Sequence, residues 1–222
     1  MVVGPMTDRL GALLAENPSL ERASRLAPRT LPVLPAFASL LPDAGLRPGT
    51  TTSITGIGAT SLALSLVARA TKDSWTASIG MPALGLRAAV ELGIDLDRFV
   101  VVDDPGKQWI DVLAALVDAF DVVLAHPPPT RHARKVSARV REQDAVLVVV
   151  GPWVESDVRV AGATSQWHGI GRGYGHLEAR SLDVTVSGRR AATRPRHATL
   201  WLPDPDGNVT AFERDNVLRL AR

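Results

Sequence analysis

Cysteine is absent from the 222-residue sequence, and lysine occurs only at Lys72, Lys107 and Lys135. Without thiols the chain forms no disulfide, no thiolate metal site and no cysteine nucleophile. No apolar run approaches the roughly 18 residues of a membrane span. The N-terminus also lacks a basic region followed by an apolar run, so we expect no signal peptide. These absences favour a cytoplasmic globular protein.

A lysine is also missing from residues 53–64, the stretch around which the chain is organised. A β-branched run precedes a glycine turn and a helical pattern follows it, as in a phosphate-binding loop. The full motif, G-x-x-x-x-G-K-[ST], uses its lysine for the phosphates and its hydroxyl for Mg²⁺. Here Gly58 and Thr60 match, but Ser53 replaces the first glycine and Ala59 replaces the lysine. We therefore expect no cofactor, with weak binding of a nucleotide or another anion at Gly58, Thr60 and Ser61 as the alternative.

Other charges that an ATPase needs are missing too. ATP hydrolysis requires a metal-binding carboxylate after a later strand and a group that positions water. His126 ends the apolar strand expected at 121–126, and Met81 follows the one at 75–79. Asp103 and Asp104 end a further strand, where such a pair more often caps a helix than holds a metal. The five histidines lack metal-ligand spacing, and no serine lies in a G-x-S-x-G turn. We predict no catalytic residue, no metal site and no enzymatic activity.

Short β-rich runs alternate with helical patterns from Thr50 onward. The expected strands are 51–55, 75–79, 98–103, 121–126 and 145–150. The expected helices are 59–71, 82–93, 106–119 and 130–142. The last three strands are nearly unbroken apolar runs, which is typical of strands buried on both faces. This alternation predicts right-handed crossovers and an α/β fold, with a mostly parallel sheet between helices on both faces.

The segments that flank this alternation differ in character. Residues 1–49 form a proline-broken leader, whose apolar part 31–41 is expected to pack on the core. After Gly151 we predict a helix at 152–168, started by Ser156 or Asp157, and then a glycine-dense loop at 169–175. Period-two alternation at 182–187 and 197–202 predicts an antiparallel C-terminal extension, with a last strand near 209–213. The expected organisation is a leader at 1–49, a domain at 50–213 and an amphipathic tail at 214–222.

Clustered basic residues are the remaining chemical signal. The first basic group comprises the basic residues between 131 and 139, which share a face of the helix expected at 130–142. The second basic group comprises the arginines between 172 and 196, which lie in glycine-rich segments with an aromatic side chain. Such segments suit single-stranded nucleic acid, because bases stack on aromatic rings and phosphates need cations. A solvated surface is the alternative, and the helix could equally bind a protein partner. Together with the amphipathic tail, the candidates for DNA or partner contact are Arg131, Arg134, Lys135, Arg139, Arg172, Tyr174, Arg189, Arg190, Arg194, Arg196, Val217, Leu218 and Leu220.

Several segments follow one another in an informative order. These are Leu40-Leu-Pro-Asp-Ala-Gly-Leu-Arg-Pro-Gly49, Gly58-Ala-Thr-Ser-Leu-Ala-Leu64, the stretch 83–97, Gly173-Tyr-Gly-His-Leu177, residues 182–190 and Leu200-Trp-Leu-Pro-Asp204. In order and spacing they resemble the RecA superfamily, and in particular ImuA-type proteins (ImuA′ of actinobacteria), over about residues 31–213. On this alignment the recombinase's catalytic Glu falls on Met81 and its metal-site Asp falls on His126. No catalytic residue carries over.

The resemblance implies a single RecA-like α/β domain with a degenerate P-loop. It also implies a non-catalytic accessory role in DNA-damage-induced, mutagenic translesion synthesis, as part of the SOS response. Proteins of this type act with ImuB, an inactive relative of Y-family polymerases, and with an error-prone C-family DNA polymerase. The expected partners are therefore an ImuB-like protein, the polymerase through the complex, and single-stranded DNA as a further candidate. The expected location is the nucleoid-associated cytoplasm.

Two other functions fit parts of the sequence. In the first, the chain is a P-loop ATPase with a displaced lysine, for which Lys72, Lys107 and Lys135 are the only candidates. In the second, it resembles SulA, a shortened RecA relative that inhibits cell division. Nucleotide affinity after mutation of each lysine would test the first, and co-purification with a tubulin-like division protein would test the second.

Overall fold

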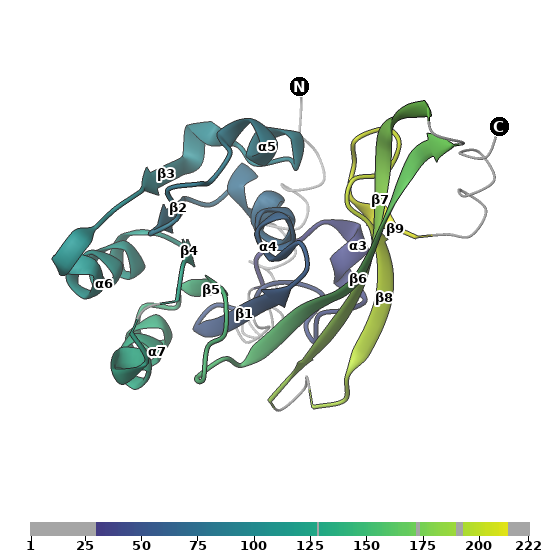
Figure 1. Ribbon diagram of the computed structural model, residues 1–222. Helices are drawn as coiled ribbons and strands as arrows, with labels where there is room; N and C mark the ends of the chain where they lie inside the picture. Colours follow the sequence, from purple (N-terminus) through teal and green to yellow (C-terminus); the bar gives the residue numbers. More distant parts are fainter. Residues whose placement is uncertain (1–29, 128, 172–173, 190–192, 213–222) are drawn as a thin grey trace, which may run out of the picture.

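The computed structural model describes residues 30–212, except for 128, 172–173 and 190–192. The described strands form one nine-stranded sheet in the order β3-β2-β4-β5-β1-β6-β7-β8-β9 (Figure 1). Their bounds are β1 Thr50–Gly56, β2 Thr76–Ile79, β3 Phe99–Val102, β4 Val122–Ala125, β5 Val146–Val150, β6 Val158–Gly171, β7 Tyr174–Gly188, β8 Arg196–Trp201 and β9 Thr210–Ala211. All strand pairs from β3 through β6 are parallel, and those from β6 to β9 are antiparallel.

Helices cover both faces of the parallel half (Figure 1). The helix bounds are α3 Pro35–Ala38, α4 Ala59–Ala68, α5 Leu86–Glu91, α6 Trp109–Ala119 and α7 Ala133–Glu142, with short 3-10 turns η1 Ala70–Lys72, η2 Leu96–Arg98, η3 Gly106–Gln108 and η4 Thr130–His132. The predicted helices are thus present but shorter. The helix expected at 82–93 starts only at Leu86, after Pro82 and Gly85, because a proline-containing turn precedes it.

The central strands explain why an unbroken apolar run indicates a parallel sheet. In β4, Val122 and Leu124 face the cluster that contains α4, whereas Val123 and Ala125 face the cluster that contains α6 and α7. All four side chains have no exposed surface. Alternate residues of a strand point to opposite faces, so a strand that is covered on both sides has no polar position. The prediction of an α/β fold with a mostly parallel sheet is confirmed.

The predicted helix at 152–168 is wrong. Val158–Gly171 form the long strand β6, which pairs with β1 in parallel from Val158 opposite Thr52 to Gly162 opposite Gly56. Asp157 does not cap a helix; its carboxylate accepts a hydrogen bond from the N–H of Thr51 at 3.0 Å and so anchors the start of this strand pair. The Ser156 hydroxyl donates to the Trp153 carbonyl in the preceding turn.

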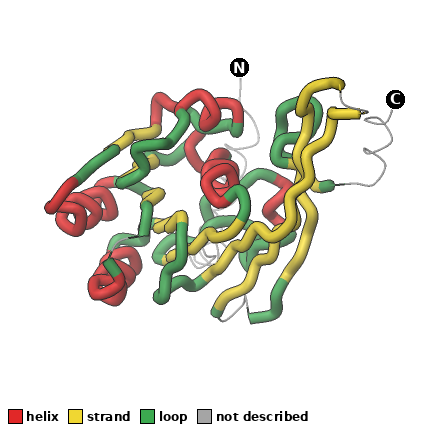
Figure 2. The backbone as a smooth tube through the Cα atoms, viewed as in Figure 1, coloured by secondary structure: helices red, strands yellow, loops and turns green. Residues whose placement is uncertain are grey.

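The predicted loop at 169–175 is also largely strand. β6 continues to Gly171 and pairs with β7 from Tyr174 onward, which makes a long antiparallel hairpin (Figure 2). Gly169 and Gly175 have φ of 110° and 112° where the register shifts between His168 and Ile170. Glycine supplies these left-handed conformations within the hairpin. The antiparallel extension formed by β7, β8 and β9 is confirmed.

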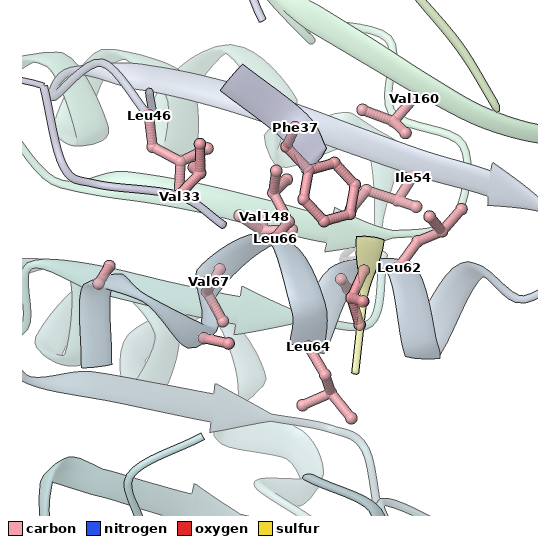
Figure 3. Packing of buried hydrophobic residues seen from close by; sticks show 14 of the residues in the cluster. Val33, Phe37, Leu46, Ile54, Leu62, Leu64, Leu66, Val67, Val148 and Val160 are labelled. Carbon is pink, nitrogen blue, oxygen red and sulfur yellow. The ribbon is translucent and has the colours of Figure 1, made fainter. Parts of the chain in front are cut away.

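The described part of the leader packs on the core. The Phe37 ring of α3 is only 1% exposed and joins a cluster with Ile54, Leu66 and Val148 (Figure 3). The guanidinium of Arg196 donates to the carbonyls of Ser39 and Leu41 and so ties β8 to this segment. Pro35 begins α3 at a position where a missing N–H costs nothing. The expected packing of 31–41 is confirmed.

No helix in the described ranges combines the length and the apolar character needed to cross a membrane. Three large apolar side chains of the β6–β7 hairpin, Trp167, Ile170 and Leu177, are 48–58% exposed. The parallel half of the sheet is thus covered by helices on both faces, whereas the antiparallel hairpin exposes apolar surface.

Candidate functional site

The turn from β1 to α4 takes the position of the phosphate-binding loop, but it is short. β1 runs through Gly56, and Ser53, which stands where the first glycine of the motif belongs, pairs with Val149 of β5 and Arg159 of β6. Only Ile57 and Gly58 therefore connect the strand to the helix. A phosphate-binding loop needs several free backbone N–H groups to surround its anion. Most of that segment is strand here.

Strand β6 further closes this turn. The N–H of Ile57 donates to the carbonyl oxygen of Gly162 at 2.9 Å. A Cβ added to Gly56 would overlap with the Gly162 carbonyl, and one added to Gly162 would overlap with the Ile57 carbonyl. Both positions require glycine because two backbones approach closely. The Ile57 N–H is consequently engaged with protein instead of facing a ligand.

Arg180 of β7 lies over the same turn. A Cβ built on Gly58 would come within 3.2 Å of Nη2 of Arg180 and 3.4 Å of Cδ2 of Leu182. Gly58 itself has φ of 71° and begins α4. This conformation favours glycine, so the residue that matched the motif serves the turn as well. Thr60 is exposed and Ser61 half-buried in the first turn of α4.

Two contacts hold the Arg180 guanidinium. Its Nε donates to the Leu202 carbonyl at 2.8 Å, and its Cζ lies 5.3 Å from the ring centroid of Trp167, a cation–π arrangement. Partial burial lowers the pKa of Arg180, because removal from water disfavours the charged form. Within the described ranges no carboxylate forms an ion pair with Arg180.

A groove of about 570 Å³ opens beside Arg180. Its walls come from α4 at Ser61, from α5 at Ala88 and from Leu92 directly after it, from the hairpin at Trp167, and from the loop that follows β8. We call it the Arg180 groove. Its size falls in the range of ligand-binding clefts, and its lining is mostly apolar with a few polar groups.

The carboxyl edge of the parallel strands carries the other residues aligned with an ATPase site. Met81 is buried just after β2, and the N–H of exposed His126, just after β4, donates to the Ile79 carbonyl at 3.1 Å. Asp103 and Asp104 are exposed, and Oδ1 of Asp104 accepts from the Gly106 N–H at 2.9 Å. Among the described residues, no group of three or more His, Asp or Glu side chains is arranged to hold a metal.

The three lysines lie in other parts of the fold. Lys72 follows the far end of α4 in η1 and pairs with Asp95 at 3.8 Å. Lys107 lies in η3 before α6, and Lys135 lies on α7, which covers the opposite face of the sheet from α4.

The first basic group is partly neutralised by carboxylates. Arg139 forms a two-point pair with Asp118 of α6, whose Nε–Oδ1 distance is 2.7 Å. This hydrogen bonding lowers the pKa of Asp118 and raises that of Arg139. Arg134 pairs with Glu155 at 3.9 Å, and Glu155 also pairs with Arg189 of the second group at 3.7 Å.

Two members of the first group differ from these. Arg131 lies in η4, one turn before α7, and not on the helix; its Nε donates to the His132 ring at 2.9 Å. Lys135 is exposed on α7. Of the expected helix face, Arg134 and Arg139 thus form ion pairs, whereas Lys135 is exposed.

The second basic group is dispersed. Arg194 is exposed in the loop before β8, whereas Arg196 is committed to the Ser39 and Leu41 carbonyls. Tyr174 begins β7. The remaining candidates, Arg172, Arg190, Val217, Leu218 and Leu220, lie outside the described residues.

The sequence pattern does not predict the Arg180 groove. Trp167 belongs to the helix expected at 152–168, whereas the structure places it opposite Arg180 in the hairpin. The missed signal is the alternation of Val158, Val160 and Gly162, which a strand beside β1 requires.

Comparisons with known proteins agree with this fold. The family model described as "MT3502 N-terminal domain" matches residues 39–155. A Mycobacterium tuberculosis (strain ATCC 25618 / H37Rv) protein, described as "Uncharacterized protein Rv3395c", is 43% identical over 122 residues, 52% of this chain and 59% of that relative. The match thus spans less than two thirds of the relative's length. The crystal structure of the RadB recombinase is similar with a TM-score of 0.59 and 14% identity, over 81% of this chain and 97% of that chain. At this identity the similarity concerns the fold.

Proposed function

The chain belongs to the MT3502 N-terminal domain family, and on that basis we propose that it is a non-catalytic RecA-like scaffold of the ImuA type. In this role it serves a DNA-damage-induced, mutagenic translesion-synthesis complex. It binds an ImuB-like partner, an inactive relative of Y-family polymerases, and through it an error-prone C-family DNA polymerase. Single-stranded DNA is a further contact, and polymerisation belongs to the partners.

The observation that carries the proposal is the state of the turn between β1 and α4. The RecA-like strand order is retained, yet only Ile57 and Gly58 connect strand to helix, and β6 binds the Ile57 N–H. Arg180 lies over Gly58. A fold that keeps its sheet while its phosphate loop becomes strand fits a protein that works through its surfaces.

Surface features support a scaffolding role over enzymatic chemistry. Exposed apolar side chains on the β6–β7 hairpin, at Trp167, Ile170 and Leu177, are of the kind that protein partners cover. The antiparallel half that carries them lies beside the parallel core (Figure 1). Binding to DNA rests on the open basic positions, chiefly Lys135 and Arg194.

The first experiment concerns catalysis. Purified full-length protein is incubated with ATP and Mg²⁺, with and without single-stranded DNA, and phosphate release is measured. We expect release equal to that of a heat-denatured sample. Substantial turnover that DNA stimulates would refute the non-catalytic part of the proposal.

The second experiment concerns the partner. The tagged chain, expressed from its own promoter, is recovered from DNA-damaged cells with and without crosslinking, and co-purifying proteins are identified by mass spectrometry. We expect an ImuB-like protein in stoichiometric amount. Recovery of a tubulin-like division protein in its place would refute the translesion role.

A further inference from the structure

The Arg180 groove combines a half-buried cation with apolar walls. Its apolar lining includes Ala88 of α5, Leu92 directly after α5, and Leu202 and Pro203 of the loop after β8. Trp167, with 48% of its surface exposed, lies at the margin under the guanidinium. Tryptophan and arginine are the residues most enriched among those that dominate binding energy at protein interfaces.

Arg180 has unused hydrogen-bonding capacity in this position. A guanidinium carries five N–H donors in a fixed plane, and Arg180 commits its Nε to the Leu202 carbonyl. No carboxylate of the described residues pairs with it, although Glu91 and Asp206 also line the groove. Glu91 instead pairs with Arg87 at 3.0 Å. A partly desolvated cation of this kind gains most from a carboxylate that binds two of its N–H groups.

We propose that the Arg180 groove is the docking site for a segment of a partner protein that carries an Asp or Glu side chain next to an aliphatic or aromatic one. The carboxylate pairs with the Arg180 guanidinium, and the apolar neighbour packs on Trp167, Leu92 and Pro203. The inference rests on the proposed scaffolding function and names the chemistry of the partner.

Charge argues for a peptide over nucleic acid at this site. Glu91 and Asp206 line the groove, and among the described residues that line it Arg180 is the only cation. A phosphate backbone needs several cations along its path, and the described lining supplies one. A single carboxylate with an apolar neighbour places one negative charge at Arg180.

Panning of a library of random 12-residue displayed peptides against the immobilised full chain tests the inference. Peptides that also bind Arg180→Met are removed by counter-selection, and the survivors are sequenced and titrated by fluorescence anisotropy. We expect enrichment of Asp or Glu beside Leu, Ile, Phe or Trp. Affinity should fall at least about tenfold in Arg180→Met and in Trp167→Ala, and Arg180→Lys should retain part of it.

Matched variants separate this effect from general damage. Trp75 is exposed to 49% at the amino end of β2, so Trp75→Ala removes an equally exposed tryptophan away from the groove. Arg98→Met, in η2, is the corresponding arginine control. Both should bind the selected peptides as the wild type does. Because Trp167 is exposed, Trp167→Ala reports on the groove even where Arg180→Met fails to fold.

Other occupants give distinct results, each of which overturns the inference. Removal of residues 213–222 that raises peptide affinity tenfold or more would assign the groove to the chain's own tail. A wild-type dimer in sedimentation that Arg180→Met dissociates would assign it to a second copy. Tight binding of a 20-nucleotide oligothymidine that Arg180→Met abolishes would assign it to DNA. Enriched peptides without carboxylates, or no enrichment, would also refute it.

The outcome is separable from that of the proposed function. Acidic–apolar peptides that depend on Arg180 uphold the inference even if no ImuB-like protein co-purifies from damaged cells. An ImuB-like partner whose binding Trp167→Ala and Arg180→Met leave unchanged upholds the proposed function and places the docking site elsewhere.

Discussion

The carbonyl oxygen of Gly162 accepts a hydrogen bond from the N–H of Ile57 at 2.9 Å, which joins β6 to the turn before α4. The two strands run in parallel up to this point, where Gly162 lies opposite Gly56. The segment that a nucleotide-binding relative of this topology would leave open as a loop is therefore part of the sheet. Close backbone approach at two glycines makes this arrangement possible.

Substitution of Gly162 by alanine should destabilise the protein by about 1–3 kcal/mol, because the new Cβ would overlap with the Ile57 carbonyl and force the strands apart. Gly85→Ala is the matched control, since its Cβ would meet the Ala88 Cβ at an ordinary 3.7 Å. We expect the control to change stability by no more than about 0.5 kcal/mol. Urea denaturation of both variants measures the difference. Equal stability of the two would show that β6 is not closed over the turn.

The parallel core was predictable because its signal is local. β4 and β5 are apolar at every position, and each is followed or preceded by a helical pattern at crossover distance. β6 was missed partly because its parallel partner is distant in sequence, with Val158 opposite Thr52. Its pairing with β7, which follows it directly, is interrupted by two register shifts. Ser156 and Asp157 imitate a helix start, and only tertiary pairing shows that the Asp157 carboxylate binds the Thr51 N–H.

The departures from the phosphate-binding motif could be read from the sequence, whereas the Arg180 groove could not. Ala59, Met81 and His126 can be compared with a motif position by position, so the absence of the motif's Lys, Glu and Asp there is visible in the sequence. The Arg180 groove combines residues from α4, α5, β6, β7 and the loop after β8. No spacing in the sequence brings Trp167 and Arg180 together; only the hairpin register does.

Phe37→Ala should destabilise the protein by about 3–5 kcal/mol, the usual cost of removing a buried phenylalanine ring. The ring is 1% exposed between the leader and the core (Figure 3). Val154→Ala, at a residue that is 57% exposed, is the control and should be nearly neutral. Thermal and urea unfolding provide the values. A loss below about 1 kcal/mol for Phe37→Ala would mean that α3 does not contribute to the core.

The Asp118–Arg139 pair predicts a specific acid response. Arg139 holds the pKa of Asp118 below its usual value in the folded state. The stabilisation is therefore complete above the unfolded-state pKa, about 3.9, and is lost as the pH falls through the lower folded-state pKa. Asp118→Asn should be less stable than the wild type at pH 7, and the two should converge in strong acid.

Urea midpoints between about pH 7 and pH 2.5 measure this convergence across the carboxyl range. Asp111→Asn, at another exposed carboxylate of α6, serves as the control for loss of one negative charge. Stability curves for Asp118→Asn and the wild type that stay parallel through the acid range would show that the pair does not form in solution.

Glu155 forms ion pairs with two arginines that the sequence predicts as candidates for DNA contact. Its carboxylate pairs with Arg134 and with Arg189, so Glu155→Gln should release both cations and strengthen binding to polyanions. We expect this variant to elute from heparin at higher salt than Glu142→Gln, which removes one carboxylate from α7 with the same change in net charge. Identical elution would indicate that these surface pairs are already open to solvent.

Restoring the missing lysine should not restore a nucleotide site. In Ala59→Lys the ammonium returns to the first position of α4, but β1 still runs through Gly56 and the Ile57 N–H still binds Gly162. The new cation would also lie close to Arg180, which already occupies the space over Gly58. Compared with an open phosphate-binding loop, the turn would offer a phosphate group one free N–H fewer and no loop to surround it.

Titration of Ala59→Lys with a fluorescent ATP analogue should therefore show no saturation up to about 1 mM. This limit corresponds to a free energy of binding weaker than about −4 kcal/mol. Ala59→Gln controls for side-chain length without the charge. A micromolar Kd for Ala59→Lys alone would mean that the lysine was the only missing part, and that the turn opens readily to admit a phosphate.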